Sequence, residues 1–376
     1  MTTRVKSGGI SDEAVTSAKI ADNSIAISDI SGGSNLLQGR NRIINGAMEI
    51  AQRGTSAVTA TGSYPVDRFP VFYSMDGAVS VQQDSSAPAG FINSTKFTTT
   101  TADTSLSASQ YVLFQQKIEG TNIADLAWGT ASAKTVTLSF WVRSSLTGTF
   151  SGSLVNSGFN RSYPFTYSIS AADTWEQKTI TIAGDTTGTW LTTNGIGIRI
   201  SWSLGVGSNF QGTANTWAGA EYYGTSSETP VIGTLNATWY ITGVQLEVGS
   251  VATSFERRHY GQELALCQRY TYIVRGNAST NPIAALGWWD NSTSARVTVS
   301  FPVVMRDDPA IIYSSLSDVN ALQVNINWNS ISAITATTET SRYSGSLTAT
   351  STGGTTGQVT ALRVVDSGYI GFSAEL

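Results

Sequence analysis

Between residues 10 and 30 a large aliphatic side chain occupies every fifth position: Ile10, Val15, Ile20, Ile25 and Ile30. A period of five matches neither the 3.6 residues of an α-helix nor the two of a β-strand. The segment also carries too few apolar side chains to offset the entropy of ordering it as a single chain. We therefore expect identical copies to supply the missing core, with the aliphatic side chains meeting on one axis in a homotrimeric stem. The alternative is a disordered polar segment, which low hydrophobicity also favours.

The composition indicates a surface with few charges. Charged residues make up 13% of the 376 residues, whereas ordinary globular chains contain about 25%. Serine, threonine, asparagine and glycine must therefore cover much of the surface, which makes the surface nearly indifferent to salt and pH. The formal charge of -4 and the lack of clustered Lys and Arg argue against a nucleic acid partner.

The ends and the cysteine content point to synthesis in a reducing cytoplasm. The start MTTRVKSGG has no apolar signal segment, and no apolar run approaches the roughly 20 residues that cross a bilayer. We expect neither a signal peptide nor membrane insertion. Cys267 is the only cysteine, so no intrachain disulfide can form. We interpret Cys267 as a small apolar core residue and not as a nucleophile.

Alternating apolar residues predict β-strands after a Gly/Ser break at residues 32–34. Two stretches place apolar side chains on one strand face: Val136, Leu138, Phe140 and Val142, then Ile196, Ile198, Ile200, Trp202 and Leu204. Between Trp239 and Val248 the apolar phase switches at Gly243, which predicts a β-bulge. Short strands with Gly, Asn and Ser turns predict an antiparallel β-sandwich with jelly-roll connections over residues 41–255. Residues 1–40 are the stem.

A short helix and a second β region complete the prediction of an all-β fold. Tyr260, Leu264, Cys267 and Thr271 have helical spacing, so we expect a helix within residues 256–275 that links two β domains. Beyond it, three stretches alternate again: Val297, Val299 and Phe301, then Leu322, Val324, Ile326 and Trp328, then Ile370, Phe372 and Ala374. These stretches predict a second, small β-sandwich over residues 276–376.

Six blocks follow one another along the chain: NRIINGAMEIAQRG, YPVDRF, LSFWVRSS, ITGVQLEVGSVATSFERRHYGQELALCQRY, FPVVMRDDPA and GYIGFSAEL. They resemble recurrent blocks of tailed-bacteriophage tail fibre proteins, and the stem resembles the AVTxAKIADxxI repeats of that family. The resemblance spans most of the chain. It implies a homotrimer, an N-terminal attachment to a phage tail or baseplate protein, a carbohydrate-binding-module-like sandwich and a distal tip that contacts the host surface. With about two decapeptide units, the stem resembles that of a stubby fibre.

The chemical inventory predicts a protein that is not an enzyme and needs no metal or cofactor. His259 is the only histidine, so an HExxH or Cys/His zinc site cannot form, and a Ser-His-Asp triad could form only around this residue. His259 follows Glu256, Arg257 and Arg258, a polar setting in which a solvated or interface histidine is ordinary.

A polysaccharide depolymerase, that is a glycoside hydrolase, is the enzymatic alternative. Such an enzyme needs only two carboxylates about 5 to 10 Å apart. Asp307 and Asp308 are adjacent before Pro309, where the pattern is typical of a turn. The chain also lacks the long solenoid repeat of a parallel β-helix.

Aromatic residues in Gly- and Asn-rich segments are the candidate glycan-binding residues. Trp288 and Trp289 precede Asp290 and Asn291; an exposed indole can stack on a sugar ring while the polar neighbours hydrogen bond to hydroxyls. A second candidate is the long connection that carries Trp217, Tyr222 and Tyr223. In both places the alternative is a core or intersubunit role, which is common for such residues.

Together these observations predict a homotrimeric phage tail fibre that adheres to host cell-surface polysaccharide. We expect the protein in the virion, after synthesis in the host cytoplasm. Three copies of a weak glycan site raise avidity through effective concentration. The alternatives are a purely structural fibre or adaptor that holds another virion protein, and the depolymerase.

The stem gives the first testable prediction. Ile20→Asp places three like charges on the proposed axis, so it should weaken or abolish the stem trimer. Light scattering measures the mass of both proteins. A monomeric wild-type protein would contradict the trimer.

Overall fold

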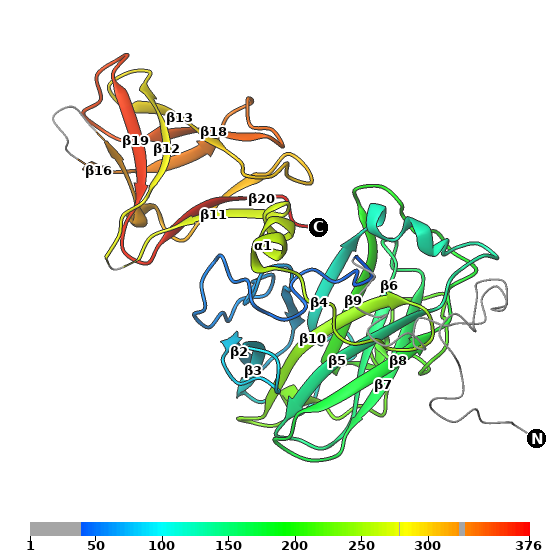
Figure 1. Cartoon of the computed structure of the whole chain (residues 1–376). Helices are drawn as coiled ribbons and strands as arrows, with labels where there is room; N and C mark the ends of the chain where they lie inside the picture. Colours follow the sequence, from blue (N-terminus) through cyan, green and yellow to red (C-terminus); the bar gives the residue numbers. More distant parts are fainter. Residues whose placement is uncertain (1–38, 278, 323–327) are drawn as a thin grey trace, which may run out of the picture.

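The computed structural model describes residues 39–277, 279–322 and 328–376. Within these ranges the chain forms two β lobes, with helix α1 between them (Figure 1). The predicted stem residues from Ile10 to Ile30 lie outside the described residues. No helix in the described part is long and apolar enough to cross a membrane.

The N-terminal lobe is a sandwich of two five-stranded sheets whose named strands all pair antiparallel. In spatial order the first sheet contains β1 (Val71–Ser74), β4 (Tyr111–Glu119), β9 (Ile196–Val206), β6 (Gly148–Val155) and β7 (Ser162–Ile169). The second sheet contains β2 (Ala78–Asp84), β3 (Ser94–Thr101), β10 (Thr238–Val248), β5 (Val136–Ser144) and β8 (Glu176–Ile182). The predicted antiparallel β-sandwich is confirmed. Short 3₁₀ helices lie in the connections: Gly120–Asn122, Ala124–Leu126, Ser208–Phe210 and Val231–Gly233.

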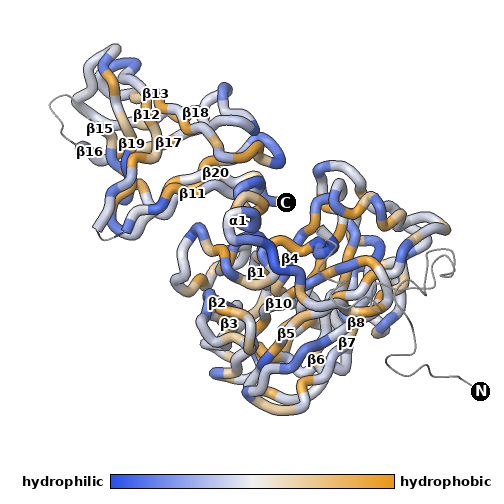
Figure 2. The backbone as a smooth tube through the Cα atoms, viewed as in Figure 1, coloured by the Kyte–Doolittle hydropathy of each residue, from blue (hydrophilic) through white to orange (hydrophobic). Residues whose placement is uncertain are grey.

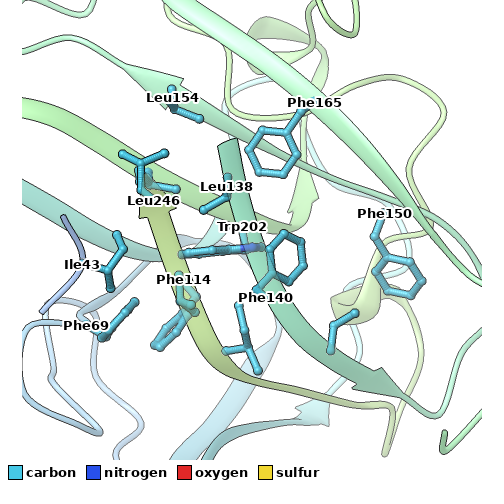
Figure 3. Packing of buried hydrophobic residues seen from close by; sticks show 14 of the residues in the cluster. Ile43, Phe69, Phe114, Leu138, Phe140, Phe150, Leu154, Phe165, Trp202 and Leu246 are labelled. Carbon is cyan, nitrogen blue, oxygen red and sulfur yellow. The ribbon is translucent and has the colours of Figure 1, made fainter. Parts of the chain in front are cut away.

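The core lies between the two sheets and follows the period of two in the sequence. The four apolar residues predicted on one face of β5, from Val136 to Val142, are all fully buried. Trp202 of β9 lies among phenylalanine side chains from both sheets (Figure 3), and its ring centroid is 5.7 Å from that of Phe140. Apolar segments run along the strands, whereas the segment that leads into α1 is hydrophilic (Figure 2). Burial of the inward faces therefore stabilises the sandwich.

The predicted bulge at Gly243 is confirmed. The pairing of β10 with β5 shifts register between Thr242 and Gln245, and Gly243 has a φ of +62°. A Cβ atom at this position would come within 2.7 Å of the Phe91 ring. Glycine therefore satisfies both the left-handed backbone and the close approach.

The C-terminal lobe contains a three-stranded and a seven-stranded sheet. The smaller sheet has the order β11 (Thr271–Arg275), β20 (Tyr369–Ser373) and β14 (Ala310–Tyr313). The larger sheet has the order β16 (Trp328–Ser330), β15 (Val319–Leu322), β19 (Val359–Val364), β12 (Ile283–Trp289), β13 (Ser294–Ser300), β18 (Ser344–Thr350) and β17 (Ala333–Ala336). One further 3₁₀ helix spans Leu316–Asp318.

Two details of this lobe differ from the prediction. The large sheet curls into a half-barrel and is not a flat layer of a second sandwich (Figure 1); the register shift between Ile283 and Ala285 adds local twist. The single strand predicted from Leu322 to Trp328 is wrong, because these two residues end and begin separate strands that pair antiparallel.

Helix α1 (Tyr260–Gln268) is shorter than predicted, and Thr271 begins β11. Cys267 is fully buried, as predicted, and packs with Ile44, Ile50 and Tyr270. Tyr260, which shares the helical spacing of Leu264 and Cys267, is 61% exposed and does not pack with them. The first turn of the helix is exposed to solvent, and Cys267 is the one residue of the helix that is buried.

Charged side chains join the two lobes. Glu119, the last residue of β4, accepts hydrogen bonds from Arg269 Nη2 at 2.7 Å and from Tyr270 Oη at 2.8 Å. Burial alone would raise the pKa of Glu119, but these hydrogen bonds hold the pKa below its usual value. Arg68 donates to Glu375, and its guanidinium lies 3.4 Å from the Tyr270 ring centre. Because these charges are paired where they are buried, they fix the C-terminal lobe against one end of the sandwich.

Candidate functional site

A hollow of about 200 Å³ opens on the outer face of the first sheet. Its lining combines aromatic rings with polar and cationic groups: Phe72, Tyr111, Leu113, Gln115, Lys117, Phe159, Arg199 and Tyr223. These residues come from β1, β4 and β9, from the β6–β7 turn and from the connection between β9 and β10. The hollow therefore depends on the register of the sheet and on two connections.

Strand β4 supplies half of this lining because its side chains alternate between the core and the outer face. Val112, Phe114 and Ile118 point into the sandwich and are buried in its core. The intervening residues line the hollow: Tyr111, Leu113, Gln115 and Lys117. One strand thus builds both the core and the site.

Two cations lie side by side on the floor of the hollow. Lys117 of β4 is the direct antiparallel partner of Arg199 of β9. Arg199 Nη1 donates to the main-chain oxygen of Asn156 at 2.7 Å, and Lys117 donates to the main-chain oxygen of Leu376. Burial and the neighbouring Arg199 lower the pKa of Lys117 to about 8. Burial also lowers the pKa of Arg199.

The turn between β6 and β7 holds an aromatic ring over these cations. Phe159 has a φ of +56° and is the only aromatic residue with positive φ in the described part of the chain. Asn156 organises the turn, because its Oδ1 accepts from the main-chain nitrogens of Asn160 and Arg161, each at 3.1 Å. The Phe159 ring remains 40% exposed, and the Arg199 guanidinium lies 4.0 Å from its centre. A bulky residue in this strained conformation is kept by its surroundings and occurs often at binding sites.

The connection from residue 207 to 237 covers the rest of the outer face. Its anchor is Glu228, whose carboxylate accepts from Ser151 Oγ, from Ser203 Oγ at 2.9 Å and from the main-chain nitrogen of Val206 at 2.8 Å. Burial raises the pKa of Glu228 to about 7, although these hydrogen bonds oppose the shift. The anchored connection packs Tyr223 against Tyr111, with ring centres 6.0 Å apart.

The structure separates the three aromatic residues predicted in this connection. Tyr223 lines the hollow, is largely buried and donates to Glu221. Trp217 packs away from the hollow, where its Nε1 donates to the main-chain oxygen of Ala183 at 2.8 Å. Tyr222 is half-buried and lies outside the lining. Only Tyr223 therefore belongs to the hollow.

The candidate glycan-binding residues of the C-terminal lobe also differ in their exposure to solvent. Trp288 is 46% exposed, whereas Trp289 is fully buried and its Nε1 donates to the main-chain oxygen of Leu322 at 3.0 Å. The prediction of Trp289 as a sugar platform is therefore wrong, because successive residues of β12 face opposite sides of the sheet. Asp290 accepts from Trp288 Nε1 at 2.9 Å, and Asn291 Oδ1 accepts from the Thr293 main chain at 2.9 Å. Trp288 remains an exposed ring in the C-terminal lobe, far along the chain from the hollow.

Most lining residues of the hollow were not predicted from the sequence. One signal was available: Tyr111 and Leu113 are apolar in the outward phase of β4, where a solvated strand would carry polar residues. Phe72, Phe159 and Arg199 gave no signal, because only folding brings them together.

The polar residues considered for catalysis have ordinary surroundings. His259 is exposed immediately before α1. Asp307 lies 3.5 Å from Arg306 Nη1, and its Oδ1 accepts from the Asp308 main chain. Among the described residues no group of three or more His, Cys, Asp or Glu side chains could hold a metal ion.

No protein-family model matches the chain, and no curated protein matches its sequence. Among solved structures, the enzymatically active domain of tailspike protein 4 from bacteriophage CBA120 is similar at 12% identity and a TM-score of 0.31, over 56% of this chain and 22% of that chain. TmCBM61, solved with β-1,4-galactotriose, is similar at 13% identity and a TM-score of 0.29, over 56% and 99% of the two chains. A family 11 carbohydrate-binding module of a Clostridium thermocellum cellulase is similar at 13% identity and a TM-score of 0.27, over 55% of this chain and 99% of that chain.

The match to the tailspike thus covers 22% of that chain's length. At these identities and TM-scores the likeness concerns the β-sandwich architecture and not what the chain binds.

The two adjacent tryptophans give a paired prediction. Trp289→Ala leaves a core cavity and should lower the free energy of unfolding by about 3 to 5 kcal/mol. Trp288→Ala removes an exposed ring, so the melting temperature should change little. Thermal unfolding followed by circular dichroism compares the two variants. Equal losses of stability would contradict the placement of Trp288 on the surface.

Glu228 gives a prediction about pH. Its folded pKa of about 7 exceeds the usual 4.5, so the neutral form is favoured in the fold. The contribution of Glu228 to the free energy of unfolding is fully present below pH 4.5 and is lost as the pH rises through 7. Between pH 5 and 8, Glu228→Gln should lose less stability than the wild type, with a difference on the order of 2 kcal/mol.

Chemical unfolding at several pH values measures this difference. Glu176→Gln is the matched control. Burial tends to raise the pKa of Glu176, but hydrogen bonds from Lys178 and the main chain hold it below its usual value, so this carboxyl titrates outside the tested range. Parallel stability curves for wild type and Glu228→Gln would contradict the raised pKa.

Proposed function

We propose that the protein is an adhesin that binds a glycan in the hollow on the first sheet. The observation that carries this proposal is the lining itself, in which the exposed ring of Phe159 and the half-buried rings of Phe72 and Tyr111 lie beside hydrogen-bonding side chains. A sugar ring has an apolar face that packs on an aromatic ring and hydroxyl groups that need donors and acceptors at its edge. Phe159, Tyr111 and Phe72 offer the rings, and Gln115 and Lys117 offer the polar groups.

The surroundings of the hollow favour selective binding. Gln115 Nε2 donates to Ser201 Oγ at 2.8 Å, which holds the amide in one orientation. Asn156 holds the turn that carries Phe159. Because these groups are positioned before a ligand arrives, less conformational entropy is lost on binding.

We further propose that the chain acts as a homotrimeric phage tail fibre. The support is the five-residue period from Ile10 to Ile30 and the six sequence blocks that resemble tail fibre proteins. In this proposal residues 1–40 form the stem and bind a tail or baseplate protein, and the β lobes contact host polysaccharide. Three hollows on one stem raise avidity, so a single site of modest affinity suffices.

We also propose that the protein binds its glycan without cutting it. The residues that line the hollow include no carboxylate. Two nearby carboxylates have partners: Glu221 accepts from Tyr223, and Glu228 accepts from two serines. A pair of acids placed across a glycosidic bond is what hydrolysis would require.

Phe159 tests the binding proposal. Phe159→Ala removes the exposed ring and should weaken adsorption to host cells by about tenfold, since stacking of this kind contributes on the order of 1 kcal/mol or more. The melting temperature should stay nearly unchanged. Tyr343→Ala is the matched control, because Tyr343 is an exposed aromatic residue of the other lobe.

Adsorption counts and thermal unfolding are measured on both variants. Unchanged adsorption with Phe159→Ala would place the receptor site elsewhere, first at Trp288. New reducing ends after long incubation with host polysaccharide would contradict binding without hydrolysis.

A further inference from the structure

A groove of about 410 Å³ lies between the two lobes, where a loop of the sandwich meets the three-stranded sheet of the C-terminal lobe (Figure 1). It is larger than the hollow of about 200 Å³ and shares no lining residue with it. One wall comes from the stretch 53–64, and the opposite wall comes from β14 and β20. Small-molecule sites of this volume often occur at the boundary between domains.

The wall from the C-terminal lobe is the outer face of β20. Ile370 and Phe372 of this strand are buried in the core of the lobe. Their neighbours Tyr369 and Ser373 therefore face the opposite side, where both line the groove. On the adjacent strand β14, Ile312 completes this wall. The wall thus combines an aromatic ring, an aliphatic side chain and two hydroxyl groups.

The loop that forms the other wall is held in place by both lobes. Val58 and Val81 of β2 exchange two main-chain hydrogen bonds, of 2.8 and 2.9 Å. From the C-terminal lobe, Arg275 of β11 donates to the main-chain oxygen of Arg53. Because these contacts exist before a ligand arrives, less conformational entropy is lost on binding.

The groove offers hydroxyl groups that the fold does not use. The following lining side chains form no hydrogen bond through their hydroxyls within the described part of the chain: Ser56, Ser63, Tyr64, Tyr369 and Ser373. Burial raises the pKa of Tyr64, so its hydroxyl keeps its proton near neutral pH. Each of these hydroxyls can donate one hydrogen bond and also accept. The lining therefore matches a ligand that is itself rich in hydroxyl groups.

Arg53, the one charged side chain of the lining, already has partners. Its Nη2 donates to Thr271 Oγ1 at 2.9 Å, and its Nη1 lies 4.0 Å from a carboxylate oxygen of Asp67 and 4.0 Å from one of Glu375. Its guanidinium carbon also lies 4.4 Å from the centre of the Tyr64 ring. The lining itself contains no carboxylate. Recognition in the groove therefore relies on rings and hydroxyls and does not require a charged ligand.

We propose that the groove between the lobes is a second saccharide-binding site, in which a neutral sugar residue packs on the Tyr369 ring while its hydroxyls bond to the free hydroxyls of both walls. A sugar ring has an apolar face that suits an aromatic or aliphatic side chain, and its hydroxyls donate and accept as those of the lining do. The site is separate from the hollow of the proposed function. Since a ligand there contacts both lobes, its binding stabilises the folded chain.

The test uses the full chain and a panel of short neutral oligosaccharides of glucose, galactose, rhamnose and N-acetylglucosamine. Calorimetry measures binding to the wild type and to Phe159→Ala, which removes the exposed ring of the hollow. We expect at least one oligosaccharide to bind Phe159→Ala and to raise its melting temperature. Binding in this background does not depend on the Phe159 ring.

One hydroxyl from each wall is then removed in the same background. Tyr369→Phe and Ser63→Ala should each weaken binding of that oligosaccharide about threefold to tenfold. The melting temperature of the free protein should stay nearly unchanged, because the fold does not use these hydroxyls. Tyr313→Phe is the matched control, since Tyr313 lies on β14 next to Ile312 and does not line the groove. It should leave binding unchanged.

The outcomes separate this site from the hollow. Binding that is lost in Phe159→Ala, and that Tyr369→Phe and Ser63→Ala do not alter in the wild-type background, would overturn the second site and leave the hollow as the glycan site. Binding that survives Phe159→Ala and weakens in both groove variants would support the second site, whether or not the hollow binds glycan. Lack of binding by every oligosaccharide, or equal weakening by Tyr313→Phe, would overturn the inference. A clear fall in the melting temperature with both groove variants would assign these hydroxyls a structural role and would also overturn it.

Discussion

The alternation of side chains along β4 is the constraint on which the other features of the structure depend. Its inward residues build the centre of the sandwich, and its outward residues line the hollow. Its last residue, Glu119, holds Arg269 and Tyr270 of the C-terminal lobe. A shift of one residue in the pairing of β4 with β9 would exchange its two faces and expose the core residues. The stability of the sandwich and the geometry of the candidate site thus depend on the same pairing of β4 with β9.

The sequence predicted those parts of the fold that depend on local periodicity. The apolar phases of β5 and β9 and the bulge at Gly243 follow from a period of two and its interruption, so they could be recognised without a structure. The antiparallel pairing of Leu322 with Trp328 could not, because alternation shows which residues share a strand face but not where one strand ends and the next begins. The end of α1 was misjudged because Thr271 fits a helical stripe and a strand equally well.

The candidate site was less predictable, because its residues come from distant parts of the chain. Tyr223 was found because it lies in a long connection with several aromatic residues, yet its neighbour Trp217 supports another part of the lobe. Phe159 and Arg199 meet only when the β6–β7 turn folds over β9. Trp288 and Trp289 could be separated into one exposed and one buried residue by the pleat, but the sequence did not show which was which.

The two faces of β4 also separate substitutions that affect the hollow from substitutions that affect the core. Substitutions in the outward phase, at Tyr111 or Lys117, change the lining of the hollow without changing the volume of the core. Substitutions at Phe159 act on a turn whose backbone is held by Asn156 and not by the ring. The lining of the hollow can therefore change through a few substitutions while the packing of the sandwich stays the same.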